Sequence, residues 1–531
     1  MKQRFYIAAL LLVFAVAFAK AKPRMVVNVV VSGLSQNDIS RYEKNFGKDG
    51  FLRLRNGGTA FSECYVEYAP TTSEAGLATL ATGALPSVHG VFSSVVFDRG
   101  SNKFEVLCRK AKSGQTEPAN KSVESGYTTQ HFTMPTLSEA VLASSPKNRA
   151  ITIAHKAVSA MILTGCKGES YWINGSGKWT SSDCYMTELP TWVQKGNSDD
   201  VNRVFAADAW YGRYVRGNYI NTHTTDILVY DQNNARRERS SRKVSEDWVK
   251  KLLSTPSGNL AIFEFAKRAV TYVASLKNDN GVTLLTISLD VPRTVAEKYG
   301  TNSIEYEDML YSLDAALAEF VTFLYAQYPQ HDDVAVVLTS DSGIGATERD
   351  NSDFKRFNTR QFEIIMNAFL SARYGQDSWV LGYADGSLYL NHDIIYSRKK
   401  SLAEVQNEVA NFALQYRGVA AVSTATGMRS AQFSRGVLGV VQNGYSPRRS
   451  GDVVVALEPG RIESDTKRVA MSGSAYAYDR HVPFVIYGGG VASQSISKRV
   501  STEQIASTLA DLMGVERPLC SDAEVLTLEK N

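Results

Sequence analysis

The chain has 531 residues, 44% of them hydrophobic and 21% charged, and this length suits a large globular fold with insertions. Its formal net charge of +4 is small for that length, and basic residues cluster only in the stretch NARRERSSRK at 234–243. A run of this kind is typical of a solvated loop, so we expect no nucleic-acid partner.

The N-terminal residues have the pattern of a secretory signal peptide. Lys2 and Arg4 precede an apolar run from Phe5 to Phe18, and alanines at 17, 19 and 21 offer an A-x-A cleavage pattern. The run is too short to span a membrane, and we expect no later stretch to be long and apolar enough for a transmembrane helix. We therefore predict a signal peptide at 1–21 and a mature chain at 22–531 that is extracytoplasmic, either periplasmic or secreted.

Near-continuous apolar runs that end in polar residues alternate with helical patterns along the mature chain. In chain order the sequence predicts a strand at 26–31, a helix at 74–81, strands at 149–156 and 282–290, a helix at 302–328, strands at 334–338, 452–459 and 483–489, and a helix at 501–514. Strands alternating with helices favour an α/β fold, in which helices sandwich a mostly parallel sheet.

Two segments interrupt this alternation. Residues 166–256 are rich in Trp, Tyr, Asn and Ser with weak periodicity, which predicts a loop-rich insertion. Residues 354–450 combine helical and short strand patterns, which predict a smaller α+β cap. The aromatic residues of the insertion could form core or a sugar-binding platform; they are Tyr171, Trp172, Trp179 and Trp192.

The chain has five cysteines, at positions 64, 108, 166, 184 and 520. In an oxidising compartment Cys166 and Cys184 could pair across a segment in which Asn174-Gly175 predicts a hairpin turn. The connectivity stays open, and one cysteine must remain unpaired or bridge elsewhere. No pair has C-x-x-C spacing, so a cysteine zinc site is not expected.

The stretch LTSDSG at 338–343 marks a candidate site. It ends an apolar run, and the carboxyl end of a buried parallel strand is where α/β enzymes usually keep their chemistry. Asp341 lies at this point, yet its neighbour is Ser342, where a metal site would favour histidine.

Four further stretches carry a family resemblance: YAPTTSEAGLATLATGALPSVHG at 68–90, GTNSIEYEDMLYSLDAAL at 300–317, GYSPRRSGDVVV at 444–455 and YAYDRHVPFVIYGGG at 476–490. The chain resembles the alkaline phosphatase superfamily, in particular the secreted bacterial phosphatases related to nucleotide pyrophosphatases and phosphodiesterases. The resemblance implies a core in which two zinc ions are held by six Asp and His ligands. A serine or threonine between the ions is the nucleophile.

The functional positions of the family can be located in this chain, but few of them keep the residue type of the family. The nucleophile falls on Ser73, which keeps a hydroxyl. The six ligand positions fall, in chain order, on Ser32, Arg293, Glu297, Asp341, Ser342 and Ser472. Two phosphate-binding positions fall on Ser94 and Lys156, and a third, an arginine in the family, is Val158. Of the six ligand positions, Asp341 alone retains its chemical type.

This ligand set is unsuited to zinc, because a serine hydroxyl is a poor zinc ligand and an arginine is repelled by the cation. We therefore expect no metal cofactor and a catalytically degenerate protein, a pseudoenzyme that acts by binding an anion or a protein partner. The alternative is an active metal-dependent phosphomonoesterase or phosphodiesterase with Ser73 as nucleophile and a rebuilt site. Asp290, Asp341 and Glu297 could supply oxygen ligands for Mg²⁺ or Ca²⁺ in such a site.

Arg293 suggests what could replace the metal charge. A buried carboxylate that loses its cation must be paired, so we expect Arg293 to pair with Asp341, Glu297 or both. Since Arg293 and Glu297 are four residues apart, an exposed helical pair is the alternative. The hypothesis predicts an anion site for a phosphate- or sulfate-bearing ligand, built from Ser73, Ser94, Lys156 and Arg293.

Overall fold

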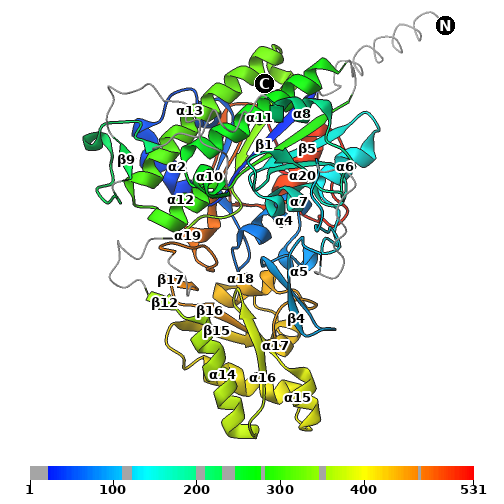
Figure 1. Ribbon diagram of the computed structural model, residues 1–531, viewed down its shortest axis with the longest axis vertical. Coiled ribbons are helices and arrows are strands. Elements are labelled where there is room, and N and C mark those ends of the chain that lie inside the picture. Colours follow the sequence, from blue (N-terminus) through cyan, green and yellow to red (C-terminus); the bar gives the residue numbers. More distant parts are fainter. Residues whose placement is uncertain are drawn as a thin grey trace, which may run out of the picture.

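The computed structural model describes residues 22–110, 122–198, 210–225, 227–229, 246–276, 281–345, 355–463 and 468–530. The predicted signal peptide at 1–21 and the basic stretch at 234–243 lie outside these residues. The chain forms a large lobe and a smaller lobe arranged along its longest axis (Figure 1).

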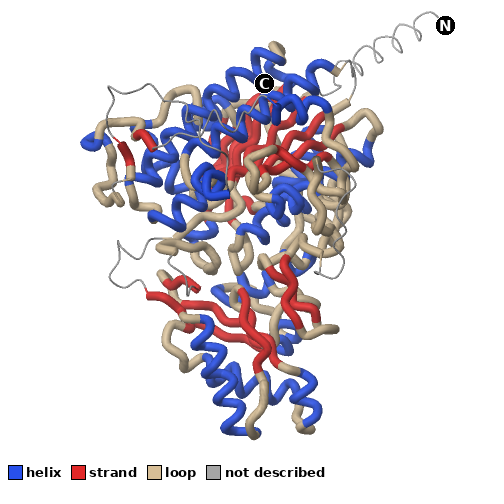
Figure 2. Tube along the Cα trace, viewed as in Figure 1, coloured by secondary structure: helices blue, strands red, loops and turns tan. Residues whose placement is uncertain are grey.

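A ten-stranded sheet forms the centre of the large lobe (Figure 2). Its order is β19-β2-β18-β11-β1-β10-β5-β6-β7, and β20 pairs with β2. The strands are β1 (Met25–Val31), β2 (Thr59–Tyr65), β5 (Arg149–Ala154), β6 (Glu169–Ile173), β7 (Trp179–Thr180), β10 (Thr283–Leu289), β11 (Val334–Thr339), β18 (His481–Gly488), β19 (Gln494–Ile496) and β20 (Val500–Ser501). The central strands from β11 to β6 are parallel, whereas β18 runs antiparallel to both β11 and β2. The predicted α/β fold is confirmed, with a mixed sheet whose centre is parallel.

Helices cover both faces of this sheet, because successive side chains of a buried strand point to opposite faces. On β1, Val27 and Val29 pack into one core and Val26 and Val30 into the other. The first core includes α2 (Gln36–Tyr42), α3 (Phe51–Gly57), α11 (Pro256–Ser275), α12 (Val291–Tyr299) and α13 (Ile304–Gln327). The second includes α4 (Ser73–Thr82), α6 (Leu137–Ser144), α7 (Ala157–Thr164) and α20 (Glu503–Met513).

Short elements complete the large lobe. They are the helices α5 (Pro86–His89), α8 (Thr191–Ser198), α10 (Glu246–Leu252) and α19 (Ala477–Arg480), the 3-10 turns Glu43–Asn45, Arg216–Asn218 and His331–Asp333, and the strand pairs β3 (Val95–Asp98) with β4 (Lys103–Val106) and β8 (Trp210–Tyr211) with β9 (Leu228–Val229). The β3–β4 hairpin extends from the large lobe along the side of the small one (Figure 1).

Within the described residues, α13 is the one helix long and apolar enough to cross a membrane by length and composition. This differs from the sequence prediction that no later stretch has these properties. Its apolar residues pack in the core of the large lobe, and it also buries Glu305, Glu307 and Asp308. We therefore interpret α13 as a core helix of this fold.

The small lobe is an α+β unit around a four-stranded antiparallel sheet of order β13-β14-β16-β15. Its elements are β12 (Lys355–Phe357), α14 (Thr359–Tyr374), β13 (Val380–Ala384), β14 (Ser387–Leu390), α15 (His392–Ser397), α16 (Leu402–Ala413), β15 (Val419–Thr424), α17 (Ala425–Ser430), α18 (Gly436–Gly444), β16 (Val453–Leu457) and β17 (Arg461–Glu463). Helices α14, α15 and α16 pack on one face, and α17 and α18 lie on the other, toward the large lobe.

The predicted cap at 354–450 stops short of this lobe's last strands. The run at 452–459, which the sequence analysis assigned to the main sheet, forms β16 and pairs with β14 and β15. A buried apolar run does not itself indicate which sheet contains it, so the pattern could not locate this strand.

The predicted insertion at 166–256 also needs correction, because its first strand, β6, pairs with β5 in the main sheet. Tyr171, Trp172 and Trp179 are buried, and Trp192 packs partly buried against this core. These aromatic residues are therefore core and not a sugar-binding platform. The predicted hairpin turn is present between β6 and β7, and all five cysteines are free thiols.

Candidate anion site

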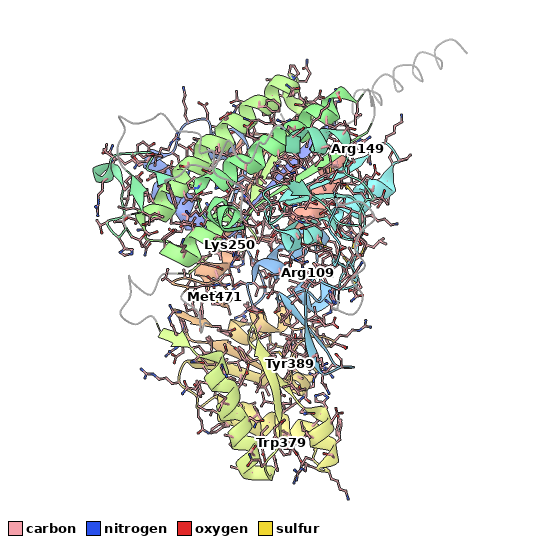
Figure 3. All side chains as sticks on the ribbon, in the orientation of Figure 1. Arg109, Arg149, Lys250, Trp379, Tyr389 and Met471 are labelled. Carbon is pink, nitrogen blue, oxygen red and sulfur yellow. The ribbon has the colours of Figure 1, made fainter. Side chains whose placement is uncertain are left out.

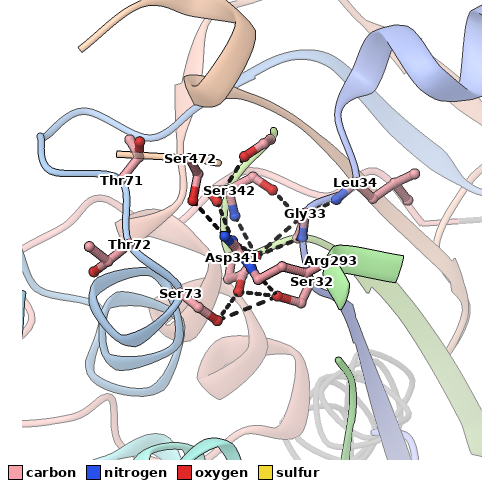
Figure 4. A network of polar contacts seen from close by, with 12 residues as sticks. Ser32, Gly33, Leu34, Thr71, Thr72, Ser73, Arg293, Asp341, Ser342 and Ser472 are labelled. Atoms are coloured by element: carbon pink, nitrogen blue, oxygen red, sulfur yellow. Dashed lines mark hydrogen bonds and ion pairs between the residues drawn. The ribbon is translucent and has the colours of Figure 1, made fainter. Parts of the chain in front are cut away.

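Three neighbouring parallel strands bring the candidate residues together. Val31 on β1 is in register with Leu289 on β10, and Val30 is in register with Thr339 on β11. Ser32, Arg293 and Asp341 follow these strands, so they meet at the carboxyl edge of the sheet (Figure 4).

The guanidinium of Arg293 lies at the centre of this cluster. Arg293 is in the first turn of α12, where Pro292 occupies an early helical position, and only 7% of the residue is exposed. Its Nε donates to Ser32 Oγ at 2.8 Å, Nη1 donates to Ser472 Oγ at 2.5 Å, and Nη2 donates to Ser342 Oγ at 2.6 Å and to Asp341 Oδ1 at 3.2 Å. Arg293 therefore binds four of the five other positions where the family resemblance expects metal ligands.

Asp341 is buried and accepts hydrogen bonds at both carboxylate oxygens. The backbone N–H groups of Gly33 and Ser342 donate to Oδ1 at 3.0 and 2.7 Å. Ser32 Oγ donates to Oδ2 at 2.6 Å, and Ser73 Oγ donates to the same oxygen. The Arg293–Asp341 ion pair that the sequence suggested is thus present within a network of hydroxyl groups.

Ser73 is the first residue of α4, which starts where the sequence places a helix N-terminus. Thr72 caps the helix by accepting a hydrogen bond from the N–H of Ala75 at 3.2 Å. The Ser73 hydroxyl lies 3.4 Å from Ser32 Oγ and donates to Asp341, so it points into the cluster (Figure 4). Ser73 thus occupies the position where the family resemblance expects a nucleophile, with the carboxylate of Asp341 beside it.

Glu74 is a charged neighbour that the sequence analysis missed. Burial raises the pKa of its carboxyl, and Asp385 raises it further, whereas Arg293 and Lys156 lower it. One sequence feature could have identified Glu74: it immediately follows the nucleophile position, in the N-terminal turn of a helix that begins at the cluster. A negative charge here competes with any anionic ligand.

Arg293 keeps its positive charge despite its burial. Burial by itself lowers the pKa of the guanidinium, but the carboxylates of Asp341, Glu297 and Glu74 outweigh this effect and raise the pKa. The site therefore contains a fixed cation, held by neutral hydroxyl groups on three sides.

Comparison with known proteins assigns the chain to a family. Residues 26–468 match the model of the type I phosphodiesterase / nucleotide pyrophosphatase family. The chain belongs to this family. It lies within the alkaline phosphatase superfamily, as the sequence motifs suggested.

Individual relatives agree with the assignment. The chain is 25% identical to alkaline phosphatase PhoV of Synechococcus elongatus, over 96% of this chain and 93% of that protein. It is 26% identical to a Myroides odoratus protein named calcium-transporting ATPase, over 94% of this chain and 93% of the relative. The crystal structure of alkaline phosphatase PafA shares the fold with a TM-score of 0.84 at 21% identity, covering 95% of this chain and 98% of PafA.

These relatives correct one expectation drawn from the sequence. The prediction that the chain is not an enzyme is contradicted, because its relatives are named alkaline phosphatases and the matching family is one of phosphodiesterases and pyrophosphatases. The family is therefore one of phosphoric ester hydrolases.

The donor set at the cluster does not fit the two zinc ions that the family resemblance implies. Zinc needs lone pairs from carboxylate, imidazole or thiolate groups, whereas the guanidinium of Arg293 has none to give. In the part of the chain that the structure describes, no group of three or more His, Cys, Asp and Glu side chains is placed to hold a metal.

The residues suggested for Mg²⁺ or Ca²⁺ point to different partners. Asp290 Oδ1 accepts a hydrogen bond from Ser159 Oγ at 2.8 Å, and Glu297 Oε2 lies 3.5 Å from Arg468 Nε. Asp341 pairs with Arg293 instead. The structure therefore does not bring these three carboxylates together as one site.

The remaining two predicted anion-binding residues lie outside the hydrogen-bonded cluster. Lys156 is exposed at the N-cap of α7, close enough to Glu74 to lower the pKa of that carboxyl. Ser94 is also exposed, just before β3, and its carbonyl accepts a hydrogen bond from Leu107 N. Lys156 thus adds positive charge to the site, whereas Ser94 makes no side-chain hydrogen bond to the cluster among the described residues.

Proposed function

We propose that this protein binds phosphoric esters at the cluster of Ser73, Arg293 and Asp341, and that its phosphoryl chemistry is independent of zinc. The observation that carries the proposal is the guanidinium of Arg293, fixed by four hydrogen bonds among the family's ligand positions. Arginine is well suited to this role, because it stays charged when buried and attracts phosphate oxygens.

The surroundings of Ser73 support binding of an anion. Ser73 begins a helix of ten residues, whose first N–H groups and dipole favour negative charge. Lys156 supplies a second, exposed cation. When Glu74 is protonated, the negative charge that opposes the anion is removed, and its raised pKa makes that form more accessible.

The same geometry supports a covalent step. The Ser73 hydroxyl donates to Asp341, so this carboxylate is placed to accept the proton as Ser73 Oγ forms a bond to phosphorus. The ester oxygen leaves with its electron pair and takes a proton from solvent, while the charge of Arg293 stabilises the phosphoryl group. Attack of water on phosphorus then breaks the bond to Ser73 Oγ and releases phosphate, and the proton on Asp341 returns to Ser73 Oγ. We expect slow turnover, because a metal ion contributes several kcal/mol to such a reaction and each 1.36 kcal/mol is about tenfold in rate.

The test is hydrolysis of an aryl phosphate and a bis-aryl phosphate, measured with and without a chelator. We expect a low rate that EDTA leaves unchanged and that Ser73→Ala abolishes. Ser87→Ala, a half-buried serine of α5 outside the cluster, is the control and should keep the wild-type rate. Activity that disappears with EDTA would overturn the zinc-independent mechanism.

Metal content gives an independent test. Mature protein is dialysed against excess zinc, passed through a desalting column and analysed by mass spectrometry. We expect far less than one zinc ion per chain, since the ligand positions hold hydroxyl groups and a cation. Two ions per chain would contradict the proposal and favour a metal-dependent hydrolase.

We also propose an extracytoplasmic location, on the basis of the signal-peptide pattern at residues 1–21. Expression of the full chain in a bacterial host, followed by N-terminal sequencing of the protein, tests this. A mature N-terminus near residue 20 or 22 is expected, and an intact Met1 in the cytoplasmic fraction would contradict it.

A further inference from the structure

A cavity extends from the anion site into the junction between the two lobes. Its lining includes Ser472, whose hydroxyl accepts a hydrogen bond from Arg293, so the cavity begins at the cluster. Met471, also in the lining, lies between the lobes in Figure 3. The opposite wall comes from the small lobe, from the β13–β14 turn and from β16 and β17. A phosphoric ester bound at Ser73 would therefore place its alcohol portion near this cavity.

Three carboxyl groups line the cavity, one from the large lobe and two from the small lobe. Asp479 accepts a hydrogen bond at Oδ2 from Ser474 N at 2.9 Å. Asp385 accepts from Ser93 Oγ at 2.5 Å, and Glu463 accepts from the hydroxyl of Tyr383. These donors are neutral. They therefore satisfy the hydrogen-bonding capacity of carboxyl oxygens but do not balance the negative charge of an ionised carboxylate.

Asp479 also has a vacant acceptor. The residue is 1% exposed, and its Oδ1 has no hydrogen-bond partner among the described residues. The arginine in the cavity lining, Arg461, makes two hydrogen bonds to Glu458, at 2.8 and 2.7 Å. A buried acceptor without a donor is costly, and a ligand that donates hydrogen bonds would remove that cost.

Burial disfavours the ionised form of these carboxyl groups. It raises the pKa of Glu463 to about 8, with a further contribution from the carboxylate of Asp385, and it raises the pKa of Asp479 to about 7. A cation entering the cavity would favour the ionised form of each group. The remaining lining is largely apolar and includes Phe92, Leu457 and Met471.

We propose that this cavity binds a cationic group, and that the ligand of the site is a phosphoric ester whose alcohol carries an ammonium group on an apolar chain. Arg293 and the start of α4 face the phosphate end, and the carboxyl groups of the cavity face the ammonium end. This inference rests on the proposed function, since it assigns the other half of the same ligand.

The experiment compares ω-aminoalkyl phosphates of two to six carbons with alkyl phosphates of equal length. Binding to the mature wild-type protein is measured by titration calorimetry in EDTA, with inorganic phosphate as the reference. At the best chain length we expect the amino compound to bind about tenfold more tightly than its alkyl counterpart, as charged hydrogen bonds commonly contribute.

Two variants identify the cavity as the origin of this preference. Glu463→Gln should reduce the ratio of amino to alkyl affinity while leaving the affinity for inorganic phosphate unchanged, and Asp385→Asn should reduce the same ratio. Glu363→Gln is the matched control, because Glu363 on α14 is a partly buried carboxyl of the small lobe outside the cavity lining, whose pKa burial also raises. If one of the two cavity variants fails to fold, the other variant and the ratio of amino to alkyl affinity in the wild-type protein still test the inference.

The outcomes separate the two proposals. Equal affinities of the amino and alkyl series, with inorganic phosphate still bound, would overturn the inference and leave the proposed function intact. Loss of the amino preference in Glu363→Gln alone would also overturn it. No measurable binding of any compound, inorganic phosphate included, would overturn the proposed function itself.

Discussion

The contribution of Arg293 to stability can be measured by substituting this residue alone, because most of its hydrogen-bond partners are neutral. Arg293→Met should leave the Asp341 carboxylate buried without a counter-charge, a change that commonly costs about 3–5 kcal/mol in the free energy of unfolding. Calorimetry should then show a clearly lower melting temperature. Adding Asp341→Asn should recover part of this loss.

A surface ion pair provides the control for that experiment. Arg24 lies 3.8 Å from Asp333, and its side chain is 52% exposed. Arg24→Met should cost about 0–1 kcal/mol. If Arg293→Met costs no more than this control, the buried ion pair does not stabilise the fold as described.

Glu74 should make anion binding depend on pH. Its pKa is raised by burial, so lowering the pH through that raised value neutralises a charge close to Arg293 and Lys156. Sulfate is the suitable probe because its own charge stays constant over this range. The wild-type affinity for sulfate should rise as the pH falls, and Glu74→Gln should bind sulfate equally well at low and high pH.

The half-buried Glu63 on β2 is the control for this prediction. Glu63→Gln should keep the wild-type pH profile. A profile that survives in Glu74→Gln would assign the pH dependence to another group.

At this scale the sequence located most of the cluster. Ser32, Ser73 and Asp341 were predictable because polar residues follow buried strands or cap a helix, and such positions meet at one edge of a parallel sheet. The role of Arg293 was predictable only in part, since its spacing from Glu297 fitted an exposed helical pair equally well. Glu74 was missed because Asp385 and Lys156, whose charges shift its pKa, lie far from it in the chain.

Helix α13 shows how one element anchors a loop-rich segment. Asp308 accepts hydrogen bonds from Trp210 Nε1 at 2.6 Å, from Arg213 N at 2.6 Å and from the hydroxyl of Tyr219 at 2.5 Å. Glu307 accepts from the backbone N–H groups of Ile220 and Asn221. Buried carboxylates of α13 thus supply hydrogen-bond acceptors to residues 210–225, in addition to the pairing of β8 with β9.

We expect Asp308→Ala to loosen this segment selectively. Two buried donors, Trp210 Nε1 and the Tyr219 hydroxyl, lose their acceptor together with the less buried N–H of Arg213, and each buried loss commonly costs about 1–3 kcal/mol. Hydrogen exchange should become at least tenfold faster at residues 210–225, as even 1.4 kcal/mol implies, with no change in phosphate affinity. Glu319→Gln on the same helix, whose side chain is 68% exposed, should leave the exchange unchanged. Uniform acceleration across the large lobe would instead indicate a global loss of stability.

The elements themselves were largely predictable, whereas their pairing was not. The helix predicted at 302–328 is found at Ile304–Gln327, since its three- and four-residue apolar spacing identifies it. Strand β16 was assigned to the wrong sheet, and β6 was hidden in a segment read as a loop-rich insertion. Periodicity reports burial and not the identity of the neighbouring strand.

The two lobes approach closely where α18 ends. A Cβ atom at Gly444 would lie 1.8 Å from the carbonyl oxygen of Ala69, so a side chain cannot fit without moving the backbone. Nearby, Asn443 Nδ2 donates to Glu67 O at 2.7 Å, and Arg449 Nη2 donates to His131 O at 2.7 Å. The junction is therefore closely packed around the cavity.

Gly444→Ala should separate the lobes at this point. We expect a loss of about 1–3 kcal/mol in stability, as in other overpacked sites, seen as a lower melting temperature. The affinity for aminoalkyl phosphates should also fall relative to inorganic phosphate. Gly175→Ala is the control, because a Cβ atom there meets nothing within 4 Å. Equal melting temperatures of the two variants would show that the junction adapts freely.

The cavity was the part of the molecule that sequence analysis could not anticipate. Its three carboxyl groups come from Asp385, Glu463 and Asp479, which belong to two lobes, and Asp479 alone lies in a stretch that carries the family resemblance. No local pattern marks such residues, because only the docking of the lobes brings them together.

Arg293 also determines the stage after synthesis at which the site becomes complete. A two-metal enzyme leaves the ribosome unfinished and must acquire its ions from its surroundings, in competition with every other metal-binding molecule there. The cation of this site is encoded in the gene and is in place as soon as α12 packs against the sheet. Such a protein would be ready to bind its ligand in a metal-starved medium, where a two-metal enzyme would remain empty.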